Sequence, residues 1–201
     1  MITFVINGET RHAVEGETIL EAALREGIHI PTLCYHPAVE PYGACRMCTV
    51  EVEQHGRVRL ETSCTIPVRE GMVVQTDSPE VYRARQTLMG LFLSRCPNVP
   101  LIQEMATEYG VLEPPYATDT PDEKCILCGL CVRVCEDVVR ANALSFSSRG
   151  IDRRVGPPYL ESTEDCIGCG ACAIVCPTDA IEMADEKEAI YKEMSLGPTA
   201  A

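Results

Sequence analysis

The chain has 201 residues, of which 46% are hydrophobic and 23% charged, so it is composed like an ordinary globular protein with room for one or two domains. Its net charge of −13 disfavours nucleic acid and anionic membranes as partners, and its apolar runs are too short for direct membrane insertion. Charges stand where a signal peptide would have its apolar stretch, so we expect a cytoplasmic protein. Acidic residues predominate in both halves, which predicts no basic tail or patch.

The first part of the chain combines short strand-like runs with one helical segment. Strand candidates at residues 2–6 and about 9–14 flank an Asn-Gly dipeptide that is typical of tight hairpins. Thr18 and Glu21 have the spacing of a capping box at the start of a helix. With the later strand-like runs TVEVE and MVVQT, residues 1–77 predict a small β-grasp-type domain.

Helical periodicity predicts a connector over residues 78–112. Ser78, followed by proline, has the residue type of a helix N-cap, and apolar residues recur at helical spacing up to Cys96. A second helix is expected to end before Gly110. The proline-rich run at 113–123 is typical of a linker.

Two segments repeat a C-x2-C-x2-C-x3-C pattern 41 residues apart, within a predicted domain of residues 124–182. The cysteines are Cys125, Cys128, Cys131 and Cys135 in the first segment and Cys166, Cys169, Cys172 and Cys176 in the second. Two-residue gaps let the backbone fold closely around one corner of an iron–sulfur cubane. The alternative is zinc, but zinc sites normally use two separated C-x2-C pairs.

In two-cluster ferredoxins the fourth cysteine of each pattern binds the other cluster. We therefore expect one [4Fe–4S] cluster on Cys125, Cys128, Cys131 and Cys176, and a second on Cys135, Cys166, Cys169 and Cys172. Glu136 stands where such patterns usually have proline, a minor departure. The last stretch, residues 183–201, predicts at most an amphipathic helix or a tail.

A separate cysteine set lies in the N-terminal domain, in the motifs PTLCYHPAVEPYGACRMCTVEVE and SCTIPV. These motifs resemble the [2Fe–2S] domain of the large peripheral iron–sulfur subunit of respiratory complex I. The same domain occurs in the diaphorase-side small subunit of NAD-reducing hydrogenases, in [FeFe] hydrogenases and in NAD-linked formate dehydrogenases. The resemblance covers nearly the whole chain and implies one [2Fe–2S] cluster on Cys34, Cys45, Cys48 and Cys64.

The chain departs from that family between its two predicted domains. The family usually has a His-plus-three-Cys [4Fe–4S] site there, whereas this sequence keeps only Cys96 and no histidine. We expect this site to be lost and Cys96 to be a buried structural thiol. His36 is either a hydrogen-bonding neighbour of the [2Fe–2S] cluster or an ordinary loop histidine. Arg46 is expected to face solvent or a partner, and its charge could raise the cluster potential.

The sequence contains no dinucleotide fingerprint, P-loop or nucleophile–base motif, so we expect no catalytic residues and no cofactor beyond the clusters. The predicted architecture is α+β: a β-grasp [2Fe–2S] domain, a helical connector and a bacterial-type ferredoxin domain with two [4Fe–4S] clusters. The leading expectation is an electron-relay subunit between an NAD(P)H/flavin subunit and a low-potential catalyst such as hydrogenase or formate dehydrogenase. The alternatives are a freestanding ferredoxin-like shuttle and a redox sensor or cluster carrier.

Overall fold

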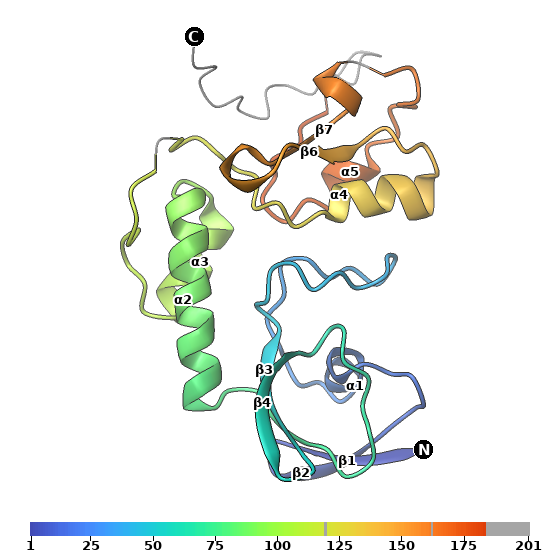
Figure 1. The fold of residues 1–201 in the computed structure, drawn as a ribbon, viewed down its shortest axis with the longest axis vertical. Helices are drawn as coiled ribbons and strands as arrows, with labels where there is room; N and C mark the ends of the chain where they lie inside the picture. The colour runs from blue at the N-terminus through green and yellow to red at the C-terminus, as the bar shows by residue number, and fades with distance from the viewer. Residues whose placement is uncertain (119, 162, 184–201) are drawn as a thin grey trace. The chain divides into compact units, whose positions relative to one another are not determined.

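The computed structural model describes residues 1–118, 120–161 and 163–183, which form two compact units (Figure 1). The first unit comprises Met1–Tyr35 and Pro41–Met89, whereas the second comprises His36–Glu40 and the described chain from Gly90 onward. Because the division falls within one long helix, the predicted helical connector contributes residues to both units.

A five-stranded mixed sheet is the framework of the first unit (Figure 1). Its strand order is β2-β1-β5-β3-β4, with β1 and β5 parallel and the other neighbours antiparallel. The strands are β1 (Ile2–Ile6), β2 (Glu9–Ala13), β3 (Thr49–Gln54), β4 (Arg57–Thr62) and β5 (Val73–Gln75). Helix α1 (Ile19–Arg25) packs against the sheet through a shared apolar core that includes Phe4, Leu20 and Val74. This mixed sheet with one packed helix agrees with the predicted α+β class.

The turn between β1 and β2 is the predicted Asn-Gly hairpin. Asn7 and Gly8 both have positive φ, at +51° and +83°, as a two-residue turn of matching twist requires. The Asn7 side chain also donates to the Thr76 hydroxyl at 2.8 Å and accepts from the Thr76 N–H at 2.9 Å. The hairpin is thereby tied to the chain that leaves β5.

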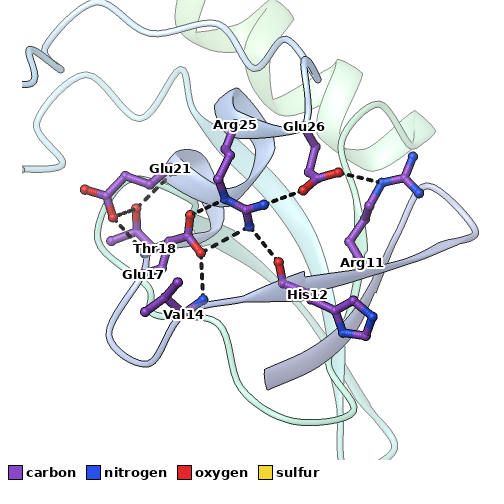
Figure 2. Close-up of polar contacts among 8 residues, drawn as sticks. All are labelled: Arg11, His12, Val14, Glu17, Thr18, Glu21, Arg25 and Glu26. Atoms are coloured by element: carbon purple, nitrogen blue, oxygen red, sulfur yellow. Dashed lines mark hydrogen bonds and ion pairs between the residues drawn. The ribbon is translucent and has the colours of Figure 1, made fainter. Parts of the chain in front are cut away.

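Side chains fix both ends of α1 (Figure 2). At its start, the Thr18 hydroxyl accepts from the Glu21 N–H at 3.2 Å, and the Glu21 carboxylate accepts from the Thr18 N–H at 2.8 Å, which confirms the predicted capping box. At its end, Arg25 donates to the Glu17 carboxylate at 3.0 Å. A helix of seven residues is unstable alone, so these contacts and its buried face are what maintain it.

Two helices follow the sheet: α2 (Pro79–Arg95) and α3 (Pro100–Glu108). The Ser78 hydroxyl accepts from the Val81 N–H at 3.4 Å, which confirms Ser78 as the residue that caps α2. Each helix has proline at its first position, where the missing N–H costs no internal hydrogen bond.

The described part of the second unit continues with short elements. They are α4 (Leu130–Arg133), a π-helical turn (Val134–Val139), the antiparallel pair β6 (Ser145–Ser147) and β7 (Arg154–Gly156), two 3₁₀ turns (Gly150–Asp152 and Pro158–Leu160) and α5 (Ala171–Ile174). No helix among the described residues is long and apolar enough to cross a membrane. The predicted helix or tail at 183–201 lies outside the described residues, except for Met183.

Candidate iron–sulfur centres

Two loops of the first unit bring the first four-cysteine set together. Cys34, Cys45 and Cys48 lie between α1 and β3, and Cys64 directly follows β4. These four residues are buried, with exposed fractions from 1% to 4%. Side-chain hydrogen bonds join Cys34 to Cys45 and Cys48 to Cys64. The set that the resemblance implied for a [2Fe–2S] cluster therefore shares one buried location.

Backbone and side-chain hydrogen bonds link the two loops. The Cys45 N–H donates to the Cys34 sulfur at 3.4 Å. Ser63 donates to the Cys48 carbonyl twice, from its N–H at 3.1 Å and from its hydroxyl at 2.8 Å. N–H groups directed at sulfur stabilise its anionic form and adjust the potential of a cluster that it binds.

The loop that carries Cys45 and Cys48 requires unusual backbone conformations. Arg46, between the two cysteines, is exposed and has a φ of +62°, and its carbonyl accepts from the Thr49 hydroxyl at 2.6 Å. Gly43 has a φ of +67°, and a Cβ at this position would lie 3.3 Å from the Thr65 side chain. Glycine satisfies both the dihedral and the close approach.

The start of α1 holds the segment that carries Cys64. The Ile19 N–H donates to the Ile66 carbonyl and the Leu20 N–H to the Ser63 carbonyl, each at 3.0 Å. The first N–H groups of a helix have no partner within the helix, and here two of them bind the cysteine segment on either side of Cys64. The capping box thus serves the site as well as the helix.

Arg85 of α2 is a buried cation beside the Cys45–Cys48 loop. It is 5% exposed, and its guanidinium donates to the Met47 carbonyl at 3.1 Å and to the Thr49 carbonyl at 2.8 Å. The planar fork of arginine can bind two carbonyls at once, which fixes the loop and places a positive charge close to it. No motif in the sequence distinguishes this arginine from the others, so its role was not predicted from the sequence.

Burial and close thiol neighbours shift the pKa values of the first set. The hydrogen bond with Cys34, followed by burial, raises the pKa of Cys45. The hydrogen bond with Cys48, followed by burial, raises the pKa of Cys64, and the same bond lowers the pKa of Cys48 to about 6. Four buried thiolates this close together need a compensating cation, which the iron of a cluster held by these residues would supply.

The eight remaining cysteines of the repeated patterns line two cavities in the second unit. One cavity is lined by Cys125, Cys128, Cys131 and Cys176, and the other by Cys135, Cys166, Cys169 and Cys172. In each cavity, three cysteines come from one pattern and the fourth from the other. This is the crossed grouping that the spacing predicts, and Ile181 lies in the walls of both cavities.

Equivalent positions of the two patterns have the same backbone conformation. Leu127 and Gly168 have φ values of +56° and +67°, and Gly129 and Gly170 both have +74°. In both patterns a short helix, α4 or α5, begins directly after the second of these residues. The repeated conformation shows that both loops fold around their cavities in the same way.

Arg95 and Glu123 both form hydrogen bonds with the backbone of Cys125, which lines the first cavity. The Cys125 N–H donates to Glu123 at 2.7 Å, and Arg95 donates to the Cys125 carbonyl at 2.7 Å. Arg95 and Glu123 also form an ion pair at 3.6 Å. Burial is the main cause of the raised pKa values of Cys125 and Cys131.

The second cavity is the more accessible one. Cys169 is exposed, whereas Cys128 and Cys131 of the first cavity are each 8% exposed. Ile167, beside Cys166, is 70% exposed, so this cavity has an apolar rim open to solvent.

Two further residues singled out by the sequence lie in ordinary surroundings. Cys96 is fully buried, and burial raises its pKa to about 12, as expected for a structural thiol. The Nδ1 atom of His36 accepts from the Ala38 N–H at 3.2 Å, a local loop contact. Neither lines the two cavities of the second unit.

The donor sets fit iron–sulfur clusters by their chemistry, since each consists of four thiols. Among the described residues, no group of three or more His, Cys, Asp or Glu side chains is arranged to hold a single metal ion. Cluster binding is therefore supported by the grouping of the thiols and by the relatives of the chain.

Both halves of the chain match known domain families. Residues 1–79 match the 2Fe-2S iron-sulfur cluster binding domain, and residues 124–180 match the 4Fe-4S dicluster domain. The chain accordingly carries one [2Fe–2S] and two [4Fe–4S] clusters.

Whole-chain relatives are components of larger oxidoreductases. The chain is 37% identical to the HndD component of the NADP-reducing hydrogenase of Solidesulfovibrio fructosivorans and 34% identical to an NADH-quinone oxidoreductase subunit of Rhizobium meliloti (strain 1021). Each match covers 90% of this chain but only 36% and 24% of the relatives.

A crystal structure of an NAD+-reducing [NiFe]-hydrogenase in the H2-reduced state includes a chain with a similar fold. The TM-score is 0.66 at 32% identity, and the match covers 77% of this chain and 74% of that one. The chain therefore belongs to the family of iron–sulfur subunits that occur in NAD(P)-linked hydrogenases and NADH-quinone oxidoreductases.

Proposed function

We propose that the chain relays single electrons inside a multisubunit oxidoreductase. The relay would connect an NAD(P)H-oxidising flavin subunit with a second redox subunit, such as a hydrogenase or formate dehydrogenase. The observation that supports this most is the pair of crossed four-cysteine cavities that share Ile181 in their walls. Three cluster sites in one chain, two adjacent ones in the second unit and a buried one in the first, suit conduction, because a sensor needs only one.

The ligand assignment that we propose follows the thiol groups. The [2Fe–2S] cluster would bind to Cys34, Cys45, Cys48 and Cys64, one [4Fe–4S] cluster to Cys125, Cys128, Cys131 and Cys176, and the other to Cys135, Cys166, Cys169 and Cys172. When bound, iron–sulfur clusters supply reversible one-electron chemistry.

The residues around the buried [2Fe–2S] site and around Cys125 would keep the geometry of these two sites fixed and limit the access of water. In the first unit, Arg85 and Ser63 hold the cysteine loops through backbone carbonyls. In the second unit, Arg95 and Glu123 hold Cys125. A rigid, dry surrounding lets a cluster change its charge with little rearrangement of protein or solvent.

The accessible second cavity suggests where an electron enters or leaves. Exposed Cys169 and Ile167 form an edge at which a partner could bring its own redox group close. The relatives named as oxidoreductase subunits support a protein partner. A cytoplasmic location remains a prediction.

The test is reduction of the anaerobically purified holoprotein, monitored by its visible absorbance. Dithionite should reduce the clusters. NADH or NADPH alone should not, whereas NADH together with an NADH-oxidising flavoprotein should reduce them catalytically.

Two results would count against this proposal. Rapid reduction by NADH in a flavin-free sample would mean that the chain itself oxidises the nucleotide. Purification of the natively expressed chain from its source, without any associated subunit even at low salt, would favour a freestanding shuttle.

A further inference from the structure

Strand β4 is an open edge of the five-stranded sheet. Among the described residues it pairs only with β3, so the main-chain groups on its other side are not used in the sheet. Its first four residues are all exposed. Val58 and Leu60, which are 57% and 43% exposed, lie on one face of the strand. An exposed edge with large apolar side chains is available for pairing with another strand.

The opposite face of β4 carries a group of arginines. The register places Arg59 opposite Val52 and Arg57 opposite Gln54, so these four side chains share one face of the sheet. They line a cavity together with Arg69, His55 and the apolar Ile66 and Met72, and Glu61 is the single carboxylate in the lining.

These guanidinium groups have no partner within the described part of the chain. The ion pairs of the first unit involve other arginines, and none engages Arg57, Arg59 or Arg69. The expectation of no basic patch is therefore wrong at this place. The net charge of the local sequence does not indicate this patch, because its arginines lie in an otherwise acidic region and come together only at the edge of the folded sheet.

Charged residues on an edge strand often serve merely to prevent aggregation. That explanation covers the arginines but not Val58 and Leu60, which expose apolar surface on the same strand. Both features are explained if the edge is covered in the assembled protein. A strand added beside β4 would direct alternate side chains to the two faces of the sheet.

We propose that β4 binds an extended segment of a partner subunit in which acidic and apolar residues alternate. The segment would add a sixth strand to the sheet through main-chain hydrogen bonds. Its carboxylates would meet Arg57, Arg59 and Arg69, and its apolar side chains would cover Val58 and Leu60. The proposal rests on the proposed function only for the identification of the partner as an oxidoreductase subunit.

The test uses the intact holoprotein and a six-residue probe, acetyl-Glu-Val-Glu-Val-Glu-Val-amide, which matches the length of β4. Isothermal titration calorimetry measures binding, and hydrogen–deuterium exchange measures protection of residues 57–62. We expect saturable binding, protection confined to this strand and at least tenfold weaker binding by the double variant Arg57→Gln/Arg59→Gln. The same peptide with lysine in place of glutamate should not bind.

Arg83→Gln is the matched control, because Arg83 is also exposed but lies on α2 and pairs with Glu80. It should bind the probe like the parent protein. Absence of binding, or equal binding by the double variant, would overturn the proposal. The proposal would also be overturned if pyrophosphate displaced the probe and did not protect the strand from exchange, since that result indicates a site for small anions. Concentration-dependent dimerisation through β4 without probe binding would also overturn it, because a second copy would then be the occupant.

None of these readouts involves electron transfer. A chain that binds the probe but does not accept electrons would contradict the proposed function alone. A chain that accepts electrons but does not bind the probe would contradict the strand addition alone.

Discussion

Replacement of Arg85 by methionine should destabilise the first unit and shift the potential of its [2Fe–2S] cluster. Methionine fills part of the same buried space but leaves the Met47 and Thr49 carbonyls without their donor. Each charge-assisted hydrogen bond contributes about 1.5–3 kcal/mol, so the loss should be about 3–5 kcal/mol after some relaxation. Removal of the nearby positive charge should also lower the cluster potential, because the reduced cluster carries more negative charge.

Arg85→Lys separates geometry from charge. Lysine keeps the charge but has one compact ammonium group in place of the planar fork, so it cannot reproduce both contacts. We therefore expect part of the stability loss and a potential closer to that of the parent protein.

Thermal unfolding of the holoprotein and an EPR-monitored redox titration measure the two effects. Arg83→Met on the same helix is the control, with an expected loss under about 0.5 kcal/mol, because its side chain is 65% exposed and its ion pair lies at the surface. Equal losses of stability in Arg85→Met and Arg83→Met, or a shift of the [4Fe–4S] signals alone, would contradict this role of Arg85.

Three further predictions concern single residues. Cys176→Ser should abolish the EPR signal of the cluster bound by the first repeated pattern and preserve the other [4Fe–4S] signal; the reverse result would contradict the crossed assignment. Gly43→Ala should lower the free energy of unfolding by about 1–2 kcal/mol because of its positive φ, and by a further amount because of its 3.3 Å contact with Thr65. Gly56→Ala, which has a φ of +72° but open space around it, should show only the first loss in denaturant unfolding. Equal losses in the two variants would exclude the steric contribution. Glu17→Gln should cost about 0.5–1 kcal/mol at neutral pH, because the hydrogen bond from Arg25 lowers the Glu17 pKa in the folded state. A lowered folded pKa contributes stability above the ordinary value of 4.5 and loses it as the pH falls through the folded pKa, so the two proteins should converge in acid, and a constant difference would refute this origin.

Local features of the fold were predictable where the sequence contains a specific residue pattern. The Asn7-Gly8 turn and the Thr18–Glu21 capping box appear as predicted, because each depends on neighbouring residues only. The crossed grouping of the eight repeated cysteines was predictable because the repeated pattern is that of two-cluster ferredoxins, in which the fourth cysteine of each pattern binds the other cluster. Their roles as ligands remain predictions until iron is located.

Features that depend on tertiary contacts were missed. Strand β4 was not predicted, because its exposed residues lack the buried face that usually marks a strand. Arg85 looked like any arginine of an amphipathic helix, and only the fold brings it to the Met47 carbonyl. The conformation of Leu127 could have been inferred, since it stands where the second pattern has Gly168.

The most direct test of the central claim is the number of electrons that the holoprotein accepts, measured together with its metal content. One [2Fe–2S] and two [4Fe–4S] clusters predict about ten iron and ten sulfide per chain and about three electrons in an anaerobic reductive titration. Zinc in place of iron, or uptake of only one electron, would contradict the account of this chain as a three-cluster relay. About fourteen iron with a fourth electron would show that the region of Cys96 also holds a cluster.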